Sequence, residues 1–389
     1  MSRRSTDPRR QAELDAETRL RSFQTGFGEE PGYLDYGKVG PLAASVAAEA
    51  SLWNDVLARS RFGAVGGIDE QDERMRVAVS SLIGFRTDQI VAQPNTSQGL
   101  MHTMFGLTGG VLLSRAEFPS LPLAVERAAE HMHVLTPRWL ETDHGRVTPG
   151  QIRAQLDDSV TAVAVSLVDY RTGYVSDLEG IRQVIGDRLL IVDAIQGFGV
   201  LDAPYEVADV VASGGQKWMR SGWGTGFLAL SDQALEHLVP VFSGVTGTDE
   251  VWPFTATPAP SRTASAYSLT RADPLAAARF AASLEETIAV GVPAIHGAIA
   301  QLVTEVIDLA DEFGIAVTSS RDETERAGIV VLEPDDAALN TLSASLANHG
   351  VTATTRGGTV RLSVHAGTSR ETLDQLRGAL VSFATAVSY

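Results

Sequence analysis

Residues 209–231 read DVVASGGQKWMRSGWGTGFLALS and place a single lysine, Lys217, between two short apolar runs. The runs at 209–214 and 226–231 have the length and composition of buried strands. The segment between them is rich in glycine and contains two tryptophans. A lysine needed only for solubility would sit among other polar residues on a helix face. The pattern therefore favours an amine held at the end of a buried strand, where it can take part in chemistry.

Similar apolar runs occur upstream of this segment and indicate the rest of a sheet. Further strand candidates are residues 89–93, 109–114, 133–137, 161–168 and 189–194. Helix-length amphipathic stretches such as 121–133 and 147–158 lie between them. Continuous apolar strands alternating with helices predict an α/β fold with a mostly parallel, seven-stranded sheet. Ligands bind such sheets at the carboxyl ends of the strands.

The organisation of the chain predicts two folded domains. Residues 1–31 are polar and charged and are expected to form an N-terminal arm. Residues 32–262 form the expected large domain, which ends in a segment rich in proline and small residues. Residues 263–389 contain helices and two strands and predict a smaller α+β domain.

Composition excludes several classes of function. The net charge of -17 disfavours a nucleic-acid partner. The chain has no cysteine, which removes disulfides, thiolate metal sites and thiol nucleophiles, and its histidines show no metal-binding spacing. We expect no apolar run long enough to cross a membrane and no signal peptide, and therefore a cytoplasmic protein without bound metal.

Four features fall at strand ends or close to them. Asp193 follows a fully apolar run, so it either caps the next helix or places a carboxylate at the strand mouth. Lys217 follows a later strand. Thr96 and its neighbours begin a helical stretch, either as a plain N-cap or as an anion site. Arg361 alternates with apolar residues on a strand, either as an edge-strand surface charge or as a bidentate carboxylate clamp.

Together these features point to pyridoxal 5'-phosphate (PLP). This cofactor needs a lysine for a Schiff base, a carboxylate for its pyridine nitrogen and an anion site for its phosphate. A guanidinium group would hold the carboxylate of a small amino-acid substrate.

The chain resembles the class V aminotransferase family of fold-type-I PLP enzymes, which also contains cysteine desulfurases, kynureninases and isopenicillin N epimerase-like proteins. The resemblance extends from GYLDYGKVGPL (32–42) to VRLSVHAGTSRETLDQL (360–376). VDAIQGFG (192–199) matches the family's Asp-x-x-Gln segment, and SGGQKWMRSGWGTGFLAL (213–230) matches its lysine segment.

The resemblance implies a role for individual residues. Asp193 would face the pyridine nitrogen, Gln196 the ring hydroxyl, and Lys217 would form the Schiff base. Arg361, in the matching RLSVH strand, would hold the substrate carboxylate. Phosphate contacts are implied for a further set, namely Thr96, Ser97, Ser213 and Gln216.

Phe118 and two departures from the family complete the comparison. Phe118, in SRAEFPS (114–120), would stack on the cofactor, although it could instead be a core phenylalanine. The absence of cysteine excludes the desulfurase nucleophile, and DYRTG (169–173) looks more like the kynureninase and epimerase-like branches. Thr270 is the nearest match to a threonine that the partner subunit often adds to the phosphate site, but its surroundings depart from the family pattern.

The expected function is that of a PLP-dependent enzyme acting on a small amino acid, with Lys217 as general base at Cα. An aminotransferase is the first expectation on family grounds, with a C–S or β-lyase, or a kynureninase- or epimerase-like enzyme, as the alternatives. A non-catalytic PLP-binding protein is disfavoured because Lys217, Asp193 and Arg361 are all present. The family resemblance also implies a homodimer.

Overall fold

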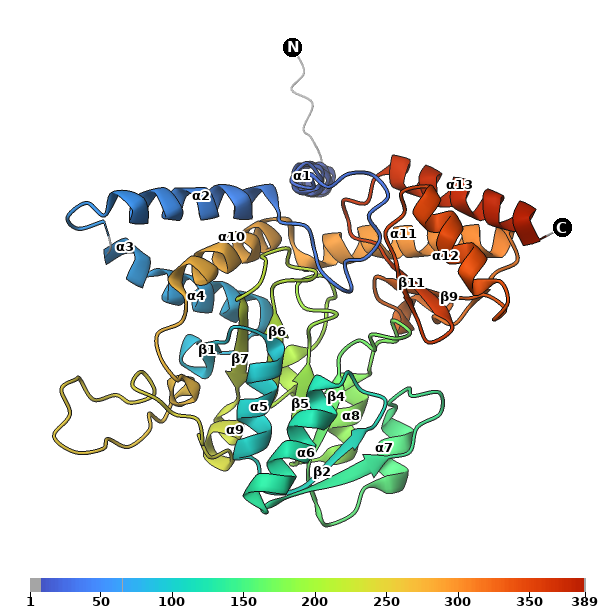
Figure 1. Cartoon of the computed structure of the whole chain (residues 1–389). Helices are drawn as coiled ribbons and strands as arrows, with labels where there is room; N and C mark the ends of the chain where they lie inside the picture. The colour runs from blue at the N-terminus through green and yellow to red at the C-terminus, as the bar shows by residue number, and fades with distance from the viewer. Residues whose placement is uncertain (1–7, 65, 388–389) are drawn as a thin grey trace.

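A seven-stranded sheet forms the centre of the computed structural model, which describes residues 8–64 and 66–387 (Figure 1). The strand order is β1-β7-β6-β5-β4-β2-β3. The strands are β1 Ile90–Ala92, β2 Gly109–Ser114, β3 Leu135–Leu140, β4 Val160–Ser166, β5 Leu189–Asp193, β6 Val210–Gly214 and β7 Gly226–Leu230. All are parallel except β7, which runs antiparallel to both β1 and β6. The predicted mostly parallel α/β sheet is confirmed.

Both faces of this sheet are covered by helices, which explains the continuous apolar runs. The helices of this part are α2 Ala44–Arg59, α3 Gly66–Asp69, α4 Gln71–Ile83, α5 Thr96–Gly106, α6 Ser120–Met132, α7 Pro149–Gln155, α8 Leu178–Ile185, α9 Asp232–His237 and α10 Pro274–Val290, with the short 3₁₀ turns Thr87–Gln89, Tyr205–Val207 and Ala264–Tyr267. Successive strand residues point to opposite faces. Ile191 of β5 packs in the cluster that contains α5 and α6, whereas Val192 packs in the cluster that contains α4, α8 and α10.

The smaller domain is built around a separate antiparallel sheet with the order β10-β11-β9-β8. Its elements are α11 Val292–Glu312, β8 Ala316–Val317, the 3₁₀ turn Glu323–Glu325, β9 Ile329–Glu333, α12 Leu339–Asn348, β10 Thr354–Arg356, β11 Thr359–Ser363 and α13 Arg370–Val387. Helices and sheet share one apolar core, as the expected α+β unit requires.

Helix α11 differs from the expectation that the chain contains no run of membrane-spanning length. It is 21 residues long, with a window of mean hydropathy 1.3 that meets the length and composition criterion for a span. Ile295, Ile299 and Val303 are buried in the core of the smaller domain, and 33% of that window is buried. A long core helix meets the same criterion, so α11 alone does not indicate a membrane protein.

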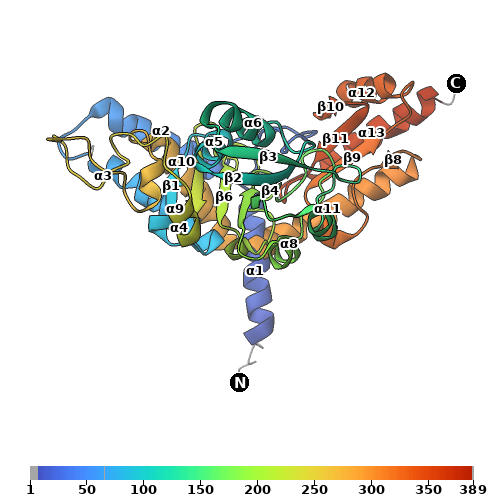
Figure 2. The same ribbon diagram turned by 90° about the horizontal axis from the view of Figure 1, so that it is seen from below.

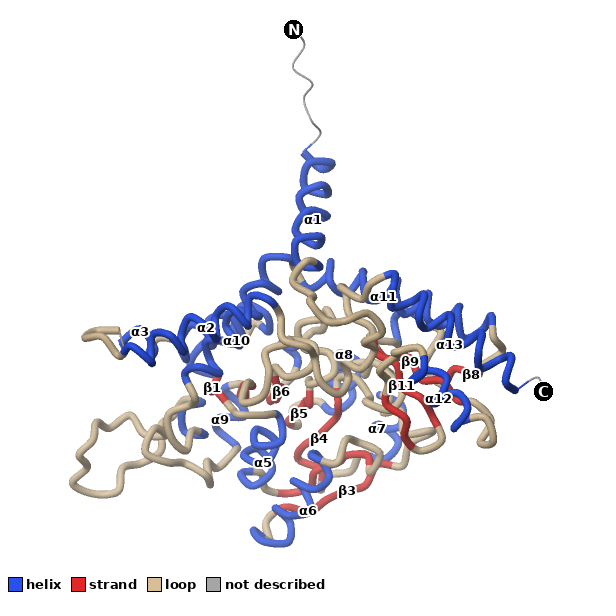
Figure 3. The backbone as a smooth tube through the Cα atoms, turned by 45° about the horizontal axis from the view of Figure 1, so that its top comes forward, coloured by secondary structure: helices blue, strands red, loops and turns tan. Residues whose placement is uncertain are grey.

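The segments at the expected domain limits have distinct structures. Residues 1–7 of the expected arm lie outside the described part of the chain, and α1 (Pro8–Gln24) projects from the body (Figures 2 and 3). Residues 239–262 contain no helix or strand and extend outward (Figure 1). Helix α10, which follows them, adds Phe280 and Leu284 to the core of the large sheet. The boundary at residue 262 stays a prediction.

Residues 32–40, called the N-terminal strap below, connect the two sheets. Leu34 N–H donates to Thr352 O (3.0 Å), and Ser363 N–H donates back to Leu34 O (2.7 Å). At the other end, Gly40 N–H donates to Gln216 O (2.8 Å), beside Lys217. A Cβ at Gly40 would lie 2.1 Å from Lys217 O, so this close approach requires glycine. The strap therefore joins the smaller sheet to the lysine loop.

Candidate active site

The carboxyl ends of β4, β5 and β6 lie side by side and bring together residues far apart in the sequence. Ser166, the last residue of β4, is paired in register with Asp193, the last residue of β5. Asp193 is in turn paired with Ala212 of β6, and Lys217 follows three residues after Gly214, where that strand ends. The parallel register thus puts Asp193 and Lys217 on one edge of the sheet.

Asp193 is a buried carboxyl group, with only 2% of the residue exposed. Its Oδ1 accepts the N–H of Ile195 at 3.1 Å. Burial raises the pKa of Asp193 to about 6, while the Ile195 N–H and the charge of Lys217 act in the opposite direction. A cation beside this carboxylate, such as a protonated pyridine, would lower the pKa from that value.

Lys217 is a largely desolvated amine. Burial lowers its pKa to about 8, and the nearby charge of Arg361 lowers it further, whereas Asp193 and Asp35 raise it. A pKa near 8 leaves an appreciable fraction of neutral amine close to neutral pH. Neutral amine is the form that attacks a carbonyl group and accepts a proton.

Phe118 and Tyr170 form an aromatic wall beside the lysine. The Lys217 Nζ lies 5.4 Å from the centroid of the Phe118 ring. Phe118 in turn meets Tyr170 edge-to-face, with centroids 5.1 Å apart and an interplanar angle of 89°. The half-buried Phe118 ring thus contacts the Lys217 amine, an arrangement compatible with the stacking role.

The start of α5 and the end of β6 bring together two buried hydroxyl groups at the expected anion site. The Thr96 Oγ1 and Ser213 Oγ atoms are both buried and have no hydrogen-bond partner among the described residues. A Cβ at Gly214 would lie 3.2 Å from Thr96 Oγ1 and 2.4 Å from Gln216 Oε1, so these groups surround the Gly214 backbone. Unpartnered hydroxyls at a helix N-terminus suit a phosphate. With the buried amine and carboxylate nearby, the residues present fit PLP.

Ser97 is placed differently from its neighbour Thr96. Its side chain is exposed and its Oγ lies 2.6 Å from Ser120 Oγ, in the first turn of α6. The residue before the helix, Asn95, is the N-cap and accepts the N–H of Gln98. The N-cap reading therefore applies to Asn95, and the anion site at Thr96 and Ser97 stays a prediction.

Gln196 is held by groups from two other parts of the chain. Its Nε2 donates to Gly37 O in the strap (2.9 Å), and its Oε1 accepts the indole N–H of Trp218 (2.9 Å). One amide hydrogen remains for a contact with a ring hydroxyl, and the amide oxygen is already bonded. The N–H of Gly37 in turn donates to Ser363 Oγ (2.8 Å).

His365 extends this network from the smaller domain. Its Nδ1 accepts Ala366 N–H (2.8 Å), so Nε2 carries the proton and donates to Trp218 O (2.9 Å). Burial lowers the pKa of His365 to about 3, and the neighbouring Arg220 charge lowers it further. The imidazole is therefore neutral and fixes the backbone next to Lys217.

Arg361 is an interior guanidinium rather than an edge-strand surface charge. Strand β11 lies between β10 and β9, and the side chain is 13% exposed. Its Nη1 donates to Tyr170 O (3.1 Å), and its Nη2 lies 3.4 Å from Asp35 Oδ1. The Nε atom has no partner among the described residues. Asp35, which the sequence analysis did not single out, also accepts the hydroxyl of Thr354.

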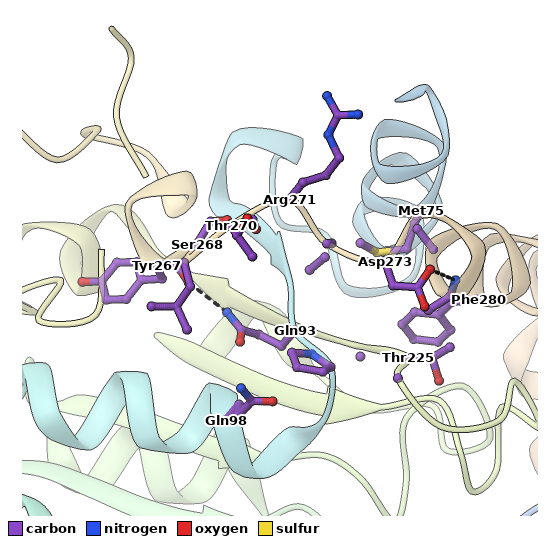
Figure 4. Close-up of a pocket in the computed structure, with 18 of the residues that line it drawn as sticks. Met75, Gln93, Gln98, Thr225, Tyr267, Ser268, Thr270, Arg271, Asp273 and Phe280 are labelled. Carbon is purple, nitrogen blue, oxygen red and sulfur yellow. Dashed lines mark hydrogen bonds between the residues drawn. The ribbon is translucent and has the colours of Figure 1, made fainter. Parts of the chain in front are cut away.

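Thr270 lies away from this group, in a cavity of about 360 Å³ (Figure 4). Gln93 also lines the cavity and donates to Tyr267 O (3.0 Å). Thr270 is exposed, and no hydrogen bond joins it to Lys217 or Thr96. Within the described residues, no group of three or more acidic or histidine side chains is arranged to hold a metal ion.

Comparisons with known proteins agree with this geometry. A model of the Aminotransferase class-V family matches residues 51–385. A probable cysteine desulfurase of Methanothermobacter thermautotrophicus is 27% identical over 213 residues. That match covers 52% of this chain and 53% of the relative, so the chain spans about half the length of that curated relative.

Solved structures resemble the whole fold. The apo cysteine desulfurase of Thermococcus onnurineus NA1 has a TM-score of 0.82 at 19% identity, covering 92% of this chain and 95% of that one. A variant of the lyase C-DES, with glycine covalently linked to its PLP cofactor, has a TM-score of 0.82 at 18% identity, covering 92% and 98%. The chain belongs to the class V aminotransferase family and is a PLP-dependent enzyme of fold type I.

Proposed function

We propose that this enzyme cleaves the Cβ–S bond of a small sulfur-containing amino acid by β-elimination. The observation that carries the proposal is the desolvated Lys217 amine, which lies between the charges of Asp193 and Arg361. Such a site has one base for Cα and one cation for the α-carboxylate. Relatives described as cysteine desulfurases, and a structure described as a cystine C–S lyase with cysteine persulfide, support sulfur chemistry.

The residues would divide the work as follows. When bound, PLP supplies an electron-accepting ring that stabilises negative charge at Cα of the amino acid. Asp193 would hold the proton on the pyridine nitrogen, and Thr96 and Ser213 would donate to the phosphate. Lys217 would hold the cofactor covalently and, once released by the incoming amine, take the Cα proton at Nζ. Arg361 would bind the α-carboxylate.

The absence of cysteine determines where the sulfur goes. With no enzyme thiol to take it, the sulfur would leave as a free thiol or hydrosulfide. The electron pair of the Cα–H bond forms the new double bond, and the pair of the Cβ–S bond leaves with sulfur. For cysteine, addition of one water then gives pyruvate, ammonium and hydrogen sulfide, so atoms and electrons balance without an oxidant.

An aminotransferase is the second candidate, supported by the description of the matching family. It would use the same Lys217 base to take the Cα proton, and bound PLP would then supply an acceptor for the amino group, with no leaving group departing from Cβ. The neutral fraction of the Lys217 amine suits both reactions, because either begins with removal of the Cα proton.

The test is the visible absorption of the PLP-loaded protein with a panel of L-amino acids and no keto acid. Under the lyase proposal, the band recovers while pyruvate and a thiol accumulate over many turnovers. A band that one amino acid bleaches permanently, with conversion to pyridoxamine 5'-phosphate, would instead establish the aminotransferase. Failure to bind PLP at all would refute both.

We also propose a homodimer. Large apolar side chains are exposed on the α2–α3 connection and on residues 239–262, which extend from the same side of the molecule (Figure 1). They include Phe62 (108% exposed), Val251 (88%) and Trp252 (73%). A self-association surface explains such exposure. Light scattering should give the mass of a dimer for the wild type and a shift toward the mass of a monomer for Trp252→Asp. A wild-type protein with the mass of a monomer would refute the proposal.

A further inference from the structure

Glu117 is a further carboxyl group near the strand ends, and the proposed chemistry does not use it. It precedes Phe118 in the loop after β2. Its Oε2 accepts the backbone N–H of Ser166, the last residue of β4, at 3.2 Å. Because Ser166 is paired in register with Asp193, this hydrogen bond connects the Phe118 loop to the end of β4, next to the Asp193 carboxylate.

The charged groups around Glu117 make its ionised form unfavourable. On the loop after β4, the charge of Asp169 is balanced by Arg171 (2.7 Å). Asp193 lies at the end of β5, and the cation whose charge acts on it, Lys217, makes no ion pair with Glu117. Among the described residues, no lysine or arginine pairs with Glu117. Although Glu117 is half-buried rather than fully buried, its ionisation would put a second negative charge beside Asp193.

The acid–base behaviour agrees with this geometry. Burial raises the pKa of Glu117 to about 7, with smaller increases from Asp169 and Asp193, and the hydrogen bonds from Ser166 only partly oppose it. Below neutral pH the group is therefore mostly a neutral acid.

We propose that Glu117 is a positioning residue that anchors the Phe118 loop to the end of β4, and that it does so as a neutral acid so that Asp193 remains the single negative charge facing the cofactor ring. The anchor sets where the Phe118 ring lies relative to Lys217. This proposal rests on the PLP site and not on the choice between lyase and aminotransferase.

The first test compares the wild type with Glu117→Gln, which keeps the acceptor for Ser166 N–H but cannot ionise. An acid whose pKa is raised by folding stabilises the protein fully below its unfolded pKa and loses that contribution as pH rises through the folded value. The full-length wild type should therefore lose stability between about pH 5 and pH 7 relative to Glu117→Gln. We expect equal melting temperatures at pH 5 and a higher one for Glu117→Gln at pH 8, with or without PLP.

The second test separates the anchor from the charge by measuring PLP affinity. Glu117→Ala removes the bond to Ser166 and should weaken PLP binding about fivefold, since a hydrogen bond is worth roughly 1 kcal/mol. Glu117→Gln should restore both the affinity and the induced circular dichroism of the bound cofactor. Glu126→Gln, an exposed partner of Arg115 on α6, is the matched control and should change nothing.

Either of two results would overturn the proposal. One is a pair of melting curves for wild type and Glu117→Gln that stay parallel from pH 5 to pH 8. The other is a Glu117→Ala protein that binds PLP as tightly as Glu117→Gln. Both results are distinct from failure of the proposed lyase activity, because neither measurement involves turnover.

Discussion

Two groups of residues are both buried and polar: the expected phosphate-binding group of Thr96 and Ser213, called the cradle below, and the strap network of Gln196, Trp218 and His365. They differ in whether their polar atoms have hydrogen-bond partners within the protein. At the cradle, Thr96 Oγ1 and Ser213 Oγ have no partner among the described residues. In the strap network, Gln196, Trp218 and His365 are bonded to one another and to the backbone. An unpaired buried polar group costs free energy, so it persists where a ligand completes it. The cradle hydroxyls have no partner within the protein, whereas the Trp218 indole and the His365 ring are paired within it and Gln196 keeps one amide hydrogen unused.

The largest effect on the cofactor site is expected from removing the Lys217 amine. The chain has only two lysines, Lys38 and Lys217, so attachment is easily assigned. Lys217→Ala should abolish covalent PLP attachment and lower turnover by roughly 10²–10⁴-fold, because the base at Cα is lost. Mass spectrometry after borohydride reduction checks attachment. Lys38→Ala, on the exposed strap position, should retain it, and label on Lys38 in the wild type would contradict the assignment.

Asp193→Asn keeps the shape of the side chain and removes its charge. PLP should remain bound through Lys217 and the cradle, while turnover falls by roughly 10²–10³-fold because the protonated ring nitrogen loses its partner. Steady-state rates and the cofactor content of the purified protein measure the two effects. Asp187→Asn, exposed before the start of β5, serves as control. A variant with full activity would exclude Asp193 as the partner of the ring.

Thr96→Val tests whether the unpartnered hydroxyl serves the phosphate. Hydrogen bonds to charged groups contribute about 1.5–3 kcal/mol, so PLP should bind roughly 10–150-fold more weakly. The stability of the protein without PLP should not fall, because no internal bond is lost. Thr103→Val on the same helix removes a hydroxyl that donates to Gly99 O (2.9 Å), and this variant should lose stability but not affinity. If Thr96→Val lowered stability and left PLP affinity unchanged, Thr96 would have a structural role and would not bind the phosphate.

The rate at which the protein captures PLP should depend on pH through Lys217. Its pKa is lowered to about 8, so the neutral amine fraction rises through that pH and levels off above it. We expect the capture rate to rise about tenfold from pH 7 to pH 9. Stopped-flow absorbance measures it. A rate that keeps rising steeply up to pH 10.5 would mean that the amine has an ordinary pKa.

On the strap side, the expected effect is on stability. Trp218→Phe removes the donor to Gln196 Oε1 and should cost about 1–3 kcal/mol of unfolding free energy. Trp223→Phe, 74% exposed, is the control and should have little effect. Urea unfolding compares them. Equal stability of the two variants would show that the bond from Trp218 to Gln196 does not stabilise the fold.

The large sheet could be predicted because its strands are buried on both faces. Residues of β4, β5 and β6 form unbroken apolar runs, and the polar residue that ends the β5 run, Asp193, lies at the binding edge. Strand β3 runs further than expected, to Leu140, and includes Pro137, which an edge strand tolerates.

Contacts between distant segments could not be predicted in the same way. The partner of Gln196 Nε2 lies 159 residues away in the strap, so nothing local indicates how the amide is oriented. The burial of Arg361 depends on the three-residue strand β10, which is too short to show periodicity. Asp35 and Glu117 were missed because a single acidic residue beside an apolar stretch has no distinctive spacing.

The order of the strands determines when each contact can form during synthesis of the chain. Strand β1 pairs only with β7, which the ribosome delivers about 135 residues later, and the strap pairs with residues 352 and 363, near the end of the chain. A nascent chain can therefore close the β1–β7 edge only after residue 230, and the pairing of the strap with the smaller sheet only after residue 363. If the strap must be in place before the cofactor binds, loading follows the synthesis of residue 363, and expression with scarce pyridoxine should yield an apoprotein that can be reconstituted afterwards.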